Sequence, residues 1–416
     1  MLKKIEDFDV AVVGAGPAGM IAAGRAAEMG SKVVLIEKNP RPGRKLLLTG
    51  KGRCNITNAE FDLRKMTERY GKKGNFLFHA LSVFGPKETV SFFEKLGLRT
   101  KIERGNRVFP VSDRAVDVLE SLERYLFKYK VVFMPGSEVI GIIKKEGRIK
   151  GLRLKGTEIS AKNYILCTGG KSYPKTGSTG EGFKWLEALG HKIEKLSPAL
   201  TPIIIKESWA KELQGLSLKN VDLGIFQAEK KQGSEFGECL FTHFGLSGPI
   251  ILEASKKVGE LLETGKVDLV LDLKPGLDFE KLDKRIQRDF EKYQNKAFKN
   301  CLIDLLPRRL IPVVIRLSGI DPEKKANSVK KEERQNLAKL LKSLKMTPDR
   351  LLGFEEAIVT SGGVCLKEID DKTMRSKIIS NLFFAGEIID IDGPSGGFNL
   401  QNCWSTGYLA GQSASA

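Results

Sequence analysis

The chain is poor in the side chains that hold metal ions and form disulfides. It has 3 histidines and 6 cysteines among 416 residues. The cysteines stand singly, at Cys54, Cys167, Cys239, Cys301, Cys365 and Cys403. No CxxC pair and no His/Cys cluster has the spacing of metal ligands. We therefore expect no metal site and six reduced thiols, as is usual for a cytosolic protein.

Long apolar runs are also absent. No stretch reaches the roughly 18 residues that a membrane-spanning helix needs, so we expect no membrane partner. The first residues, MLKKIEDFD, include acids and are followed directly by an apolar strand. This leaves no room for a secretory signal peptide. The sequence thus predicts a cytoplasmic protein.

The chain lacks the motifs of two classes of enzyme. Ser247 stands in GLSGP, which does not have the GxSxG spacing of hydrolases with a nucleophilic serine. Cys54 has no second cysteine before Cys167, so a redox-active disulfide at that position is not expected.

Basic residues are in excess. There are 69 Lys and Arg against 51 Asp and Glu, a formal net charge of +18, which attracts anions such as phosphorylated cofactors and nucleic acid. The surplus is distributed along the chain, and residues 324–345 mix both signs on an expected helix. No aromatic-interleaved basic patch or known RNA module accompanies it. Nucleic-acid binding stays open as an alternative and is not the first choice.

A nucleotide-binding fingerprint stands near the start of the chain. An apolar strand at 10–13 leads into Gly14, Gly16 and Gly19, which form GxGxxG before a helix rich in small residues. In such a βαβ unit the first glycine permits the tight turn, the second lets a pyrophosphate approach the backbone, and the third allows helix–strand packing. The pyrophosphate is expected at the positive N-terminus of the helix. Glu37, at the end of the second strand, is expected to bond the ribose hydroxyls of an adenosine.

Two later segments favour FAD over NAD as the dinucleotide. NLFFAGE ends a strand at Gly386 and Glu387, and NYILCTGG ends another at Thr168. They resemble the third and the middle motif of two-dinucleotide-binding flavin domains. In such domains the late strand returns beside the first strand and its acid bonds the ribityl chain. Here that acid is Glu387, where an Asp is more usual. An NAD-dehydrogenase domain does not need this late return.

The loop that follows the NLFFAGE strand is also expected to contact the flavin. DGPSGGFNLQN would bring backbone N–H groups and a positive helix end to the pyrimidine side of the flavin ring, where negative charge develops on reduction.

Five segments together resemble a bacterial family described as NAD(P)/FAD-dependent oxidoreductases, which includes aminoacetone-oxidase-like enzymes and a reductase of bile-acid intermediates. The segments are GRKLLLTGKGRCNITN, GGKSYPKTGSTGEGF, FTHFGLSGP, TSGGV and AGEIIDIDGPSGGFNLQN. With the fingerprint they extend from residue 10 to residue 411. Two positions depart from the pattern: Lys51 stands where small residues are common, and Phe398 where a tyrosine is common.

This resemblance implies an α/β fold with a Rossmann-type FAD domain built from both ends of the chain. The domain would comprise residues 1–195 and 355–416. An insertion at 196–354 would consist of a β-rich part (196–275) and a mostly helical part (276–354), and it would cover the substrate pocket.

The motifs predict which residues contact FAD. They are Gly14, Gly16, Pro17, Ala18, Gly19, Glu37 and Lys38 in the fingerprint unit; Lys45, Thr49, Gly50, Arg53, Cys54 and Asn55 after it; Thr168, Gly169 and Gly170 in the middle motif; and Gly386, Glu387, Gly396, Gly397, Phe398 and Asn399 near the end.

Few catalytic side chains are expected, because the flavin carries out hydride transfer and the protein positions and polarises the reactants. His243 is a candidate proton donor, Arg107 could hold an anionic substrate or the cofactor, and Asn55 is a polar candidate near the ring. For His243 a structural role is favoured over a catalytic one, and for Arg107 a surface or structural role is at least as probable.

The sequence therefore predicts an FAD-dependent oxidoreductase that moves hydride through flavin N5 to or from a small or medium organic substrate. A second strand–GxGxxG–helix unit is lacking. Either NAD(P)H visits the flavin transiently, or the flavin is reduced by the substrate and reoxidised by oxygen or another acceptor. The alternatives are a flavoprotein that binds or modifies RNA and a non-catalytic flavin redox sensor. The substrate, the electron partner and the oligomeric state stay open.

Overall fold

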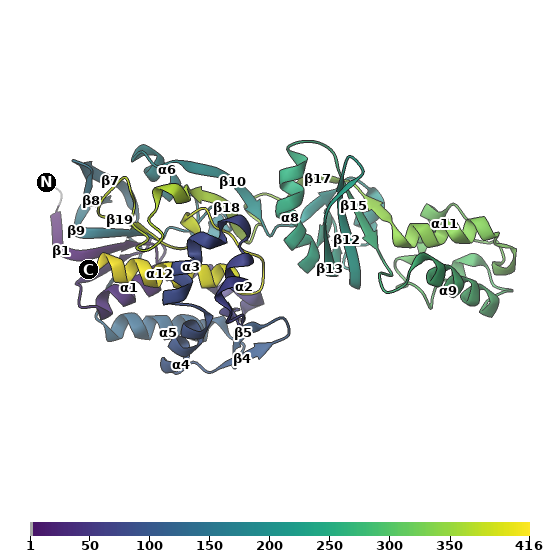
Figure 1. Ribbon diagram of the computed structural model, residues 1–416, viewed down its shortest axis with the longest axis horizontal. Coiled ribbons are helices and arrows are strands. Elements are labelled where there is room, and N and C mark those ends of the chain that lie inside the picture. The colour runs from purple at the N-terminus through teal and green to yellow at the C-terminus, as the bar shows by residue number, and fades with distance from the viewer. Residues whose placement is uncertain (1–2) are drawn as a thin grey trace. The chain divides into compact units, whose positions relative to one another are not determined.

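The computed structural model describes residues 3–416; the first two residues of the MLKKIEDFD segment lie outside that range. The chain divides into two compact units. Unit 1 is formed by the chain up to Pro198 together with Phe354–Ala416, and unit 2 is Ala199–Gly353 (Figure 1). An α/β domain is thus interrupted by an insertion, as predicted.

A seven-stranded sheet forms the centre of unit 1. Its strand order is β6-β2-β1-β9-β8-β7, with β19 also paired to β9. The strands β6, β2, β1, β9 and β19 run parallel, and β7 and β8 form an antiparallel hairpin against β9. The strands are β1 (Lys3–Val13), β2 (Val33–Ile36), β6 (Val132–Met134), β7 (Val139–Lys145), β8 (Arg148–Leu154), β9 (Thr157–Leu166) and β19 (Leu382–Phe384).

Helices and two small sheets surround this sheet. The helices of unit 1 are α1 (Pro17–Glu28), α2 (Leu63–Glu68), α3 (Gly74–Val83), α4 (Pro86–Lys95), α5 (Ala115–Lys128), α6 (Glu181–Ala188) and α12 (Phe398–Ala414). The small sheets pair β3 (Thr57–Asn58), β5 (Arg107–Pro110) and β4 (Thr100–Glu103) in that order, and β10 (Ile193–Ala199) with β18 (Val359–Val364).

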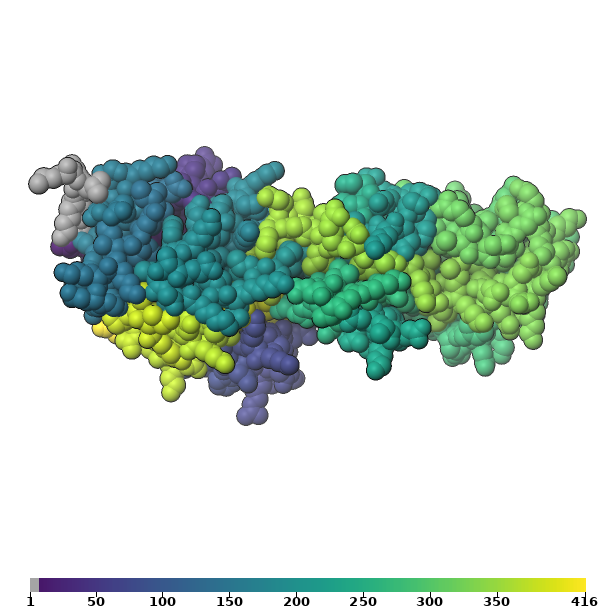
Figure 2. Space-filling view, turned by 90° about the horizontal axis from the view of Figure 1, so that it is seen from above, coloured from purple at the N-terminus to yellow at the C-terminus, as the bar shows by residue number. Residues whose placement is uncertain are grey.

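The two ends of the chain are joined by close packing of α12 on α1. A Cβ on Gly407 would lie 2.5 Å from the carbonyl oxygen of Ala18, and one on Gly411 would lie 2.4 Å from that of Ala22. Larger residues at these positions would therefore push the helices apart. Figure 1 shows the yellow α12 beside the purple α1, and in Figure 2 the yellow C-terminal residues share one surface with blue and teal residues of unit 1.

The prediction that the late strand returns beside the first strand was wrong in detail. β19 pairs with the last residues of β9, Tyr164 to Leu166, and β9 lies between it and β1. β8 pairs with the beginning of the same strand, through Thr157 to Ile159. The C-terminal half of β9 was therefore the free edge that β19 could join.

Unit 2 is built on an antiparallel sheet of order β16-β15-β12-β13-β14-β11-β17. Its strands are β11 (Ile203–Ile205), β12 (Ser217–Gln227), β13 (Lys230–Thr242), β14 (Gly245–Ser247), β15 (Val267–Asp272), β16 (Leu344–Met346) and β17 (Pro348–Leu351). Its helices are α7 (Ser208–Glu212), α8 (Pro249–Leu262), α9 (Phe279–Lys292), α10 (Ile311–Ser318) and α11 (Lys331–Lys342). The part expected to be mostly helical ends in two strands that rejoin the sheet, and the β-rich part contains the long helix α8.

A buried histidine of unit 1 provides a test of this fold. His191 is 4% exposed; its Nδ1 lies 3.0 Å from Oε2 of Glu368, and its Nε2 lies 3.0 Å from Oγ of Ser376. The Ser376 hydroxyl accepts N–H bonds from Ile378 and Ile379, so its proton is available to Nε2. Burial lowers the pKa of His191, although Glu368 opposes the change. The neutral ring is the form that fits.

We expect the free energy of unfolding to decrease as the pH falls below about 6.5. In this range His191 binds a proton in the unfolded chain but stays neutral in the folded protein. Urea unfolding between pH 7.5 and 5 measures this slope. His191→Gln should flatten it, by up to about 1.4 kcal/mol per pH unit. Equal slopes in the two proteins would contradict the assignment.

Candidate functional site: a cofactor cradle in unit 1

The glycine-rich turn after β1 has the geometry of a dinucleotide site. Gly14 has a φ of +99°, and its N–H donates to the carbonyl of Ile36 at 2.8 Å. A Cβ on Gly19 would lie 1.8 Å from the carbonyl oxygen of Gly14, so only glycine lets α1 approach the turn. A Cβ on Gly16 would meet nothing within 4 Å. Gly16 is also the N-cap of α1 and has no side-chain cap. The turn therefore offers space and the N–H groups at the start of a helix, which suit a phosphate.

The acid at the end of β2 is held in place by the same turn. Glu37 is 8% exposed. Its Oε2 accepts the Ala15 N–H at 2.8 Å, and its Oε1 accepts the N–H of Asn39 at 2.8 Å and its side-chain amide at 2.7 Å. Because these bonds fix the carboxylate, it is oriented before any ligand binds.

A cleft of about 570 Å³ opens at this end of β2. Its lining includes Lys38, Asn39, Gly136, Ser137, Gly177 and Thr179. The ammonium of Lys38 donates to Thr179 Oγ1 at 2.8 Å and to Glu181 Oε2 at 2.9 Å. The cleft lies where the adenosine half of the cofactor was expected, and Lys38 contributes to its wall.

The segment after β2 is sharply kinked. Within Leu46–Gly52, Thr49 is extended, and Gly50 and Lys51 have φ values of +56° and +58°. The Thr49 hydroxyl donates to the Leu46 carbonyl at 2.6 Å. Lys51 thus occupies a backbone conformation that suits the small residues expected there.

Cys54 follows this kink, with a φ of +60°. Its thiol is buried, and burial raises its pKa to about 12, opposed by a hydrogen bond with Thr49. It is therefore an unreactive thiol at neutral pH. All six cysteines are free thiols.

A carboxylate joins segments that are far apart in the sequence. Glu387, expected at the ribityl chain, accepts the Lys45 ammonium on Oε2 at 2.7 Å and the Thr360 N–H on Oε1 at 2.7 Å. A Cβ on Gly386 would lie 2.7 Å from the Cβ of Ala18, which places the third motif against the start of α1. The fingerprint, the segment after β2 and the C-terminal motif therefore meet, as the sequence predicted.

Two buried polar atoms in the predicted set have no hydrogen-bond partner. They are the hydroxyl of Thr168, in the middle motif, and Oδ1 of Asn55. Buried polar groups are nearly always paired, so an unpaired one calls for an explanation such as a ligand. Gly169, with a φ of +71°, and Gly170 follow Thr168. A Cβ on Gly170 would lie 2.3 Å from the Thr360 hydroxyl.

The loop before α12 is closed by its own side chains. Asn399 accepts the Gly393 N–H at 2.9 Å and donates to the Gly393 carbonyl at 2.8 Å. Gly397 has a φ of +102° and is the N-cap of α12, with no side-chain cap. Phe398 is buried and packs edge-on against Tyr70, whose hydroxyl donates to the Phe398 carbonyl. Asn399 and Phe398 shape the loop, and the N–H groups of the helix start are left for a ligand.

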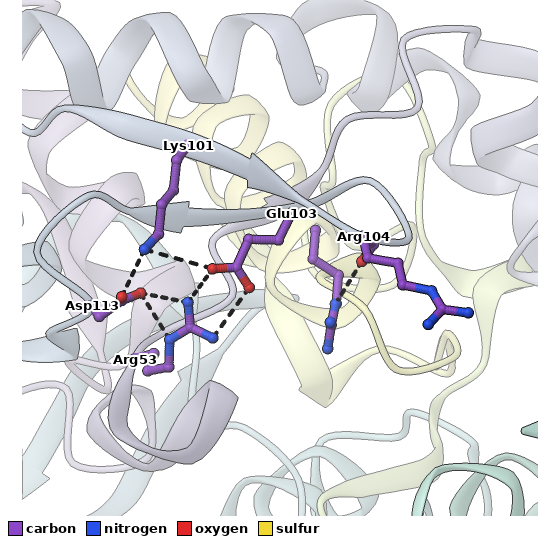
Figure 3. Close-up of polar contacts among 6 residues, drawn as sticks. Arg53, Lys101, Glu103, Arg104 and Asp113 are labelled. Carbon is purple, nitrogen blue, oxygen red and sulfur yellow. Dashed lines mark hydrogen bonds and ion pairs between the residues drawn. The ribbon is translucent and has the colours of Figure 1, made fainter. Parts of the chain in front are cut away.

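Two of the residues predicted for the site, Arg53 and His243, make contacts with other side chains of the protein. The guanidinium of Arg53 donates to Asp113 and Glu103 (Figure 3). Its positive charge is thereby neutralised. The guanidinium also stacks 4.0 Å from the ring centre of Phe109. His243 is exposed in the turn between β13 and β14, in unit 2, with its ring 4.8 Å from that of Phe244.

Three residues of this site were not predicted. Thr360 bonds Glu387, although its motif TSGGV was noticed. Asn39 fixes Glu37 and directly follows Lys38. Asp390, three residues after Glu387, is 5% exposed and pairs with Lys73 at 2.5 Å; burial raises its pKa against the effect of that lysine. Proximity to a recognised motif was the available signal in each case.

The described residues form neither a metal centre nor a membrane-spanning helix. Among the side chains that the structure describes, no group of three or more His, Cys, Asp or Glu could hold a metal ion. No helix of residues 3–416 is long and apolar enough to cross a membrane.

Sequence comparison identifies relatives over almost the whole chain. It is 31% identical over 409 residues to a 3-dehydro-bile acid delta(4,6)-reductase from Clostridium scindens, covering 97% of this chain and 98% of the relative. It is 30% identical over 411 residues to the ribosomal RNA dihydrouridine synthase of Escherichia coli, covering 98% of each.

Structural comparison agrees on the fold. The 3-ketosteroid-delta4-(5alpha)-dehydrogenase from Rhodococcus jostii superposes with a TM-score of 0.57 at 15% identity, covering 100% of this chain and 98% of that one.

A family model described as the HI0933-like protein Rossmann domain matches residues 8–413. This match agrees with the parallel sheet, the glycine turn and the three segments that meet at Glu387. The chain belongs to the HI0933-like family of FAD-dependent Rossmann flavoproteins, a family of oxidoreductases.

Proposed function

We propose that this protein is an FAD-dependent reductase that saturates a carbon–carbon double bond conjugated to a carbonyl group, with NAD(P)H as the electron donor. The observation that carries the proposal is the meeting of three distant segments at Glu387, which completes a cradle for one dinucleotide. Family membership implies that this dinucleotide is FAD. Because the family consists of oxidoreductases, the alternative of a non-catalytic redox sensor loses its support.

The kind of bond is supported by what two relatives have in common. One is named for reducing delta(4,6) positions of a 3-dehydro-bile acid, the other for making dihydrouridine in ribosomal RNA. In both substrates the double bond is conjugated to a carbonyl, although one is a steroid and the other a nucleobase. The shared chemistry is therefore the reduction, and the substrates differ.

The chain's own residues would bind and orient the cofactor. The N–H groups at the start of α1 and the space at Gly16 suit the pyrophosphate. Glu37, beside the cleft at the end of β2, suits the adenosine ribose. Glu387 suits the ribityl hydroxyls, and the unpaired Thr168 hydroxyl and Asn55 carbonyl are free to bond cofactor oxygens or nitrogens.

FAD supplies hydride transfer when it is bound. The N-terminal end of α12, which begins after Gly397, would lie towards the pyrimidine edge of the ring and would stabilise negative charge there. The kinked segment from Thr49 to Asn55 would run along the ring.

RNA is the second candidate for the substrate of the same reaction. The specific observations are the net charge of +18 and the full-length similarity to a synthase that acts on ribosomal RNA. A small carbonyl-conjugated substrate, as in the other relative, is the first candidate. The chain has one fingerprint unit, which FAD would occupy. We therefore propose that NAD(P)H binds only transiently, as a visiting donor.

An anaerobic titration of the purified protein with NADH, and separately with NADPH, tests the proposal. We expect one of the two to bleach the flavin absorbance with about one equivalent per flavin, and a conjugated enone to restore it without oxygen. An α,β-saturated ketone of the same skeleton is the control and should leave the flavin reduced. A flavin that stays oxidised with both donors, or a reduced flavin that no enone or uridine-containing RNA reoxidises, would contradict the proposal.

A further inference from the structure

The basic surplus is more local than the sequence first suggested. Residues 44–114 contain 16 Lys or Arg against 7 Asp or Glu. This stretch holds the kinked segment of the cradle and the small sheet of β3, β5 and β4. This stretch therefore holds half of the net charge of +18, in the part of unit 1 that carries the proposed flavin site, and the other half is distributed over the rest of the chain.

The β4–β5 hairpin and Arg53 contribute four cations to this region, and two of them are neutralised. Asp113 accepts from Arg53 at 2.8 Å and from Lys101 at 2.6 Å, and Glu103 accepts from Arg53 at 3.2 Å. The pKa values of Asp113 and Glu103 lie below their ordinary range because of these hydrogen bonds. Figure 3 shows the four groups as one closed cluster.

The other two cations stand on the turn of the hairpin. Arg104 and Arg107 are both exposed. Neither has an ion pair with a carboxylate among residues 7–416, whose side chains the structure describes. Arg107 Nε donates to the Arg104 carbonyl at 3.0 Å, and Figure 3 shows the Arg104 guanidinium pointing away from the cluster. Gly105 and Asn106, between them, have φ values of +77° and +56°. This tight turn therefore presents two unneutralised guanidinium groups.

A single side chain connects this turn to the proposed flavin site. The amide of Asn58 donates to the Gly105 carbonyl at 3.1 Å and to the Gly396 carbonyl at 3.1 Å. A Cβ on Gly397 would lie 2.3 Å from the backbone of Thr57. The arginine turn thus lies beside the loop that begins α12, where the pyrimidine edge of the flavin is proposed.

We propose that Arg104 and Arg107 bind an anionic group of the substrate, a carboxylate or a phosphodiester, while the substrate's double bond lies at the flavin. The proposal rests on the proposed function for the location of the reacting bond. Guanidinium groups bind carboxylate and phosphate through paired N–H donors, and a turn anchored by Asn58 holds them at a set distance from the ring. A bile acid and an RNA strand, the substrates named for the two relatives, share this chemistry.

The test measures binding of two anionic probes to the FAD-loaded protein. One probe is 3-oxochol-4-en-24-oate, followed by the change in flavin absorbance; the other is a fluorescein-labelled 12-nucleotide oligouridylate, followed by anisotropy. In R104Q/R107Q we expect at least one of them to bind 10-fold or more weakly. For the oligouridylate, the slope of log K against log salt should also fall by about 0.7 for each phosphate that the variant no longer neutralises. R104K/R107K keeps the positive charges, so its affinity for the probes should lie between those of the wild type and R104Q/R107Q.

Two controls test whether the loss of affinity is specific to the two arginines and to the anionic group of the probe. The methyl ester of the steroid acid, which lacks the charge, should bind the wild type and R104Q/R107Q alike. K145Q/R148Q removes two cations from the hairpin of β7 and β8, across unit 1 from β4 and β5 in Figure 1, and should leave the affinity for both probes unchanged.

The outcomes distinguish the two sources of the anion. A loss confined to the steroid acid assigns the turn to a carboxylate, and a loss confined to the oligouridylate assigns it to phosphodiesters. The proposal is overturned if the wild type binds neither probe, if R104Q/R107Q binds both as the wild type does, or if K145Q/R148Q weakens binding equally. Because binding is read without turnover, a failure of the proposed reduction would appear separately, as normal binding without flavin reoxidation.

Discussion

Replacing Gly16 by alanine should severely weaken FAD binding and leave the fold intact, whereas the same replacement at Gly19 should strongly destabilise unit 1. At Gly16 the backbone is extended, with φ −78°, and a Cβ would meet nothing within 4 Å. The protein therefore has room for the methyl group, and the proposed pyrophosphate does not. We expect the dissociation constant of FAD to rise about 100-fold or more, equivalent to about 3 kcal/mol.

At Gly19 the situation is reversed. A Cβ would lie 1.8 Å from the Gly14 carbonyl oxygen and 3.2 Å from the Cβ of Cys167. Helix α1 would have to move away from the sheet, at a cost of about 3 kcal/mol or more. We expect low yield and a lowered melting temperature with or without added FAD.

Circular dichroism, thermal unfolding and FAD titration of the apoprotein would separate the two effects. Gly30→Ala is a suitable control, because Gly30 also has open space around it but lies at the end of α1 away from the glycine turn. Its φ of +95° makes a modest loss of stability expected, with FAD affinity unchanged. If the Gly16→Ala protein bound FAD as tightly as the wild type, the proposal that the pyrophosphate lies at this turn would be contradicted.

The second large effect concerns the Lys45–Glu387 pair. Their side chains are 21% and 15% exposed, so removing one partner leaves a largely buried charge. We expect Lys45→Met to lower the free energy of unfolding by about 2 kcal/mol. Glu387→Gln should cost less, because its amide oxygen can still accept the Thr360 N–H. In the double variant most of the lost stability should return, since no unpaired charge is left.

FAD binding should not return with the stability. Glu387→Gln removes a charged acceptor from the proposed ribityl site, which is worth about 1.5–3 kcal/mol, or roughly 10- to 100-fold in the dissociation constant. The double variant should show the same loss. Urea unfolding of the apoprotein and FAD titration of all four proteins complete the cycle. If affinity recovered together with stability, Glu387 would act only by supporting the fold.

Much of the cofactor site could be predicted from the sequence because its signals are local. Gly14 and Gly19 are required by a backbone turn and a helix contact only five residues apart, and Glu37 follows a strand that the apolar pattern marks clearly. The resemblance of NLFFAGE and NYILCTGG to flavin motifs likewise predicted that Glu387 and Thr168 belong to one site.

The hydrogen-bond partners of individual polar side chains could not be predicted in this way. Arg53 looked available for the cofactor, but the β4–β5 hairpin brings Glu103 to it, and Asp113 follows the hairpin in sequence. Asn399 looked like a ligand contact, but its amide is used within its own loop. In both cases a polar side chain found a partner inside the protein, and a motif does not show which partners the fold will supply.

By itself the sequence determined the α/β class, the dinucleotide turn and the oxidoreductase family, because steric limits on φ and the spacing of glycines act within a few residues. The tertiary structure alone decided that β19 joins β9, that Thr360 and Lys45 share Glu387, and that Arg104 and Arg107 keep their charges unneutralised beside the Gly396 loop. These results depend on which edge of a sheet is free and which carboxylates come within hydrogen-bond distance. Such choices are made when segments that are tens to hundreds of residues apart pack together, where no local rule applies.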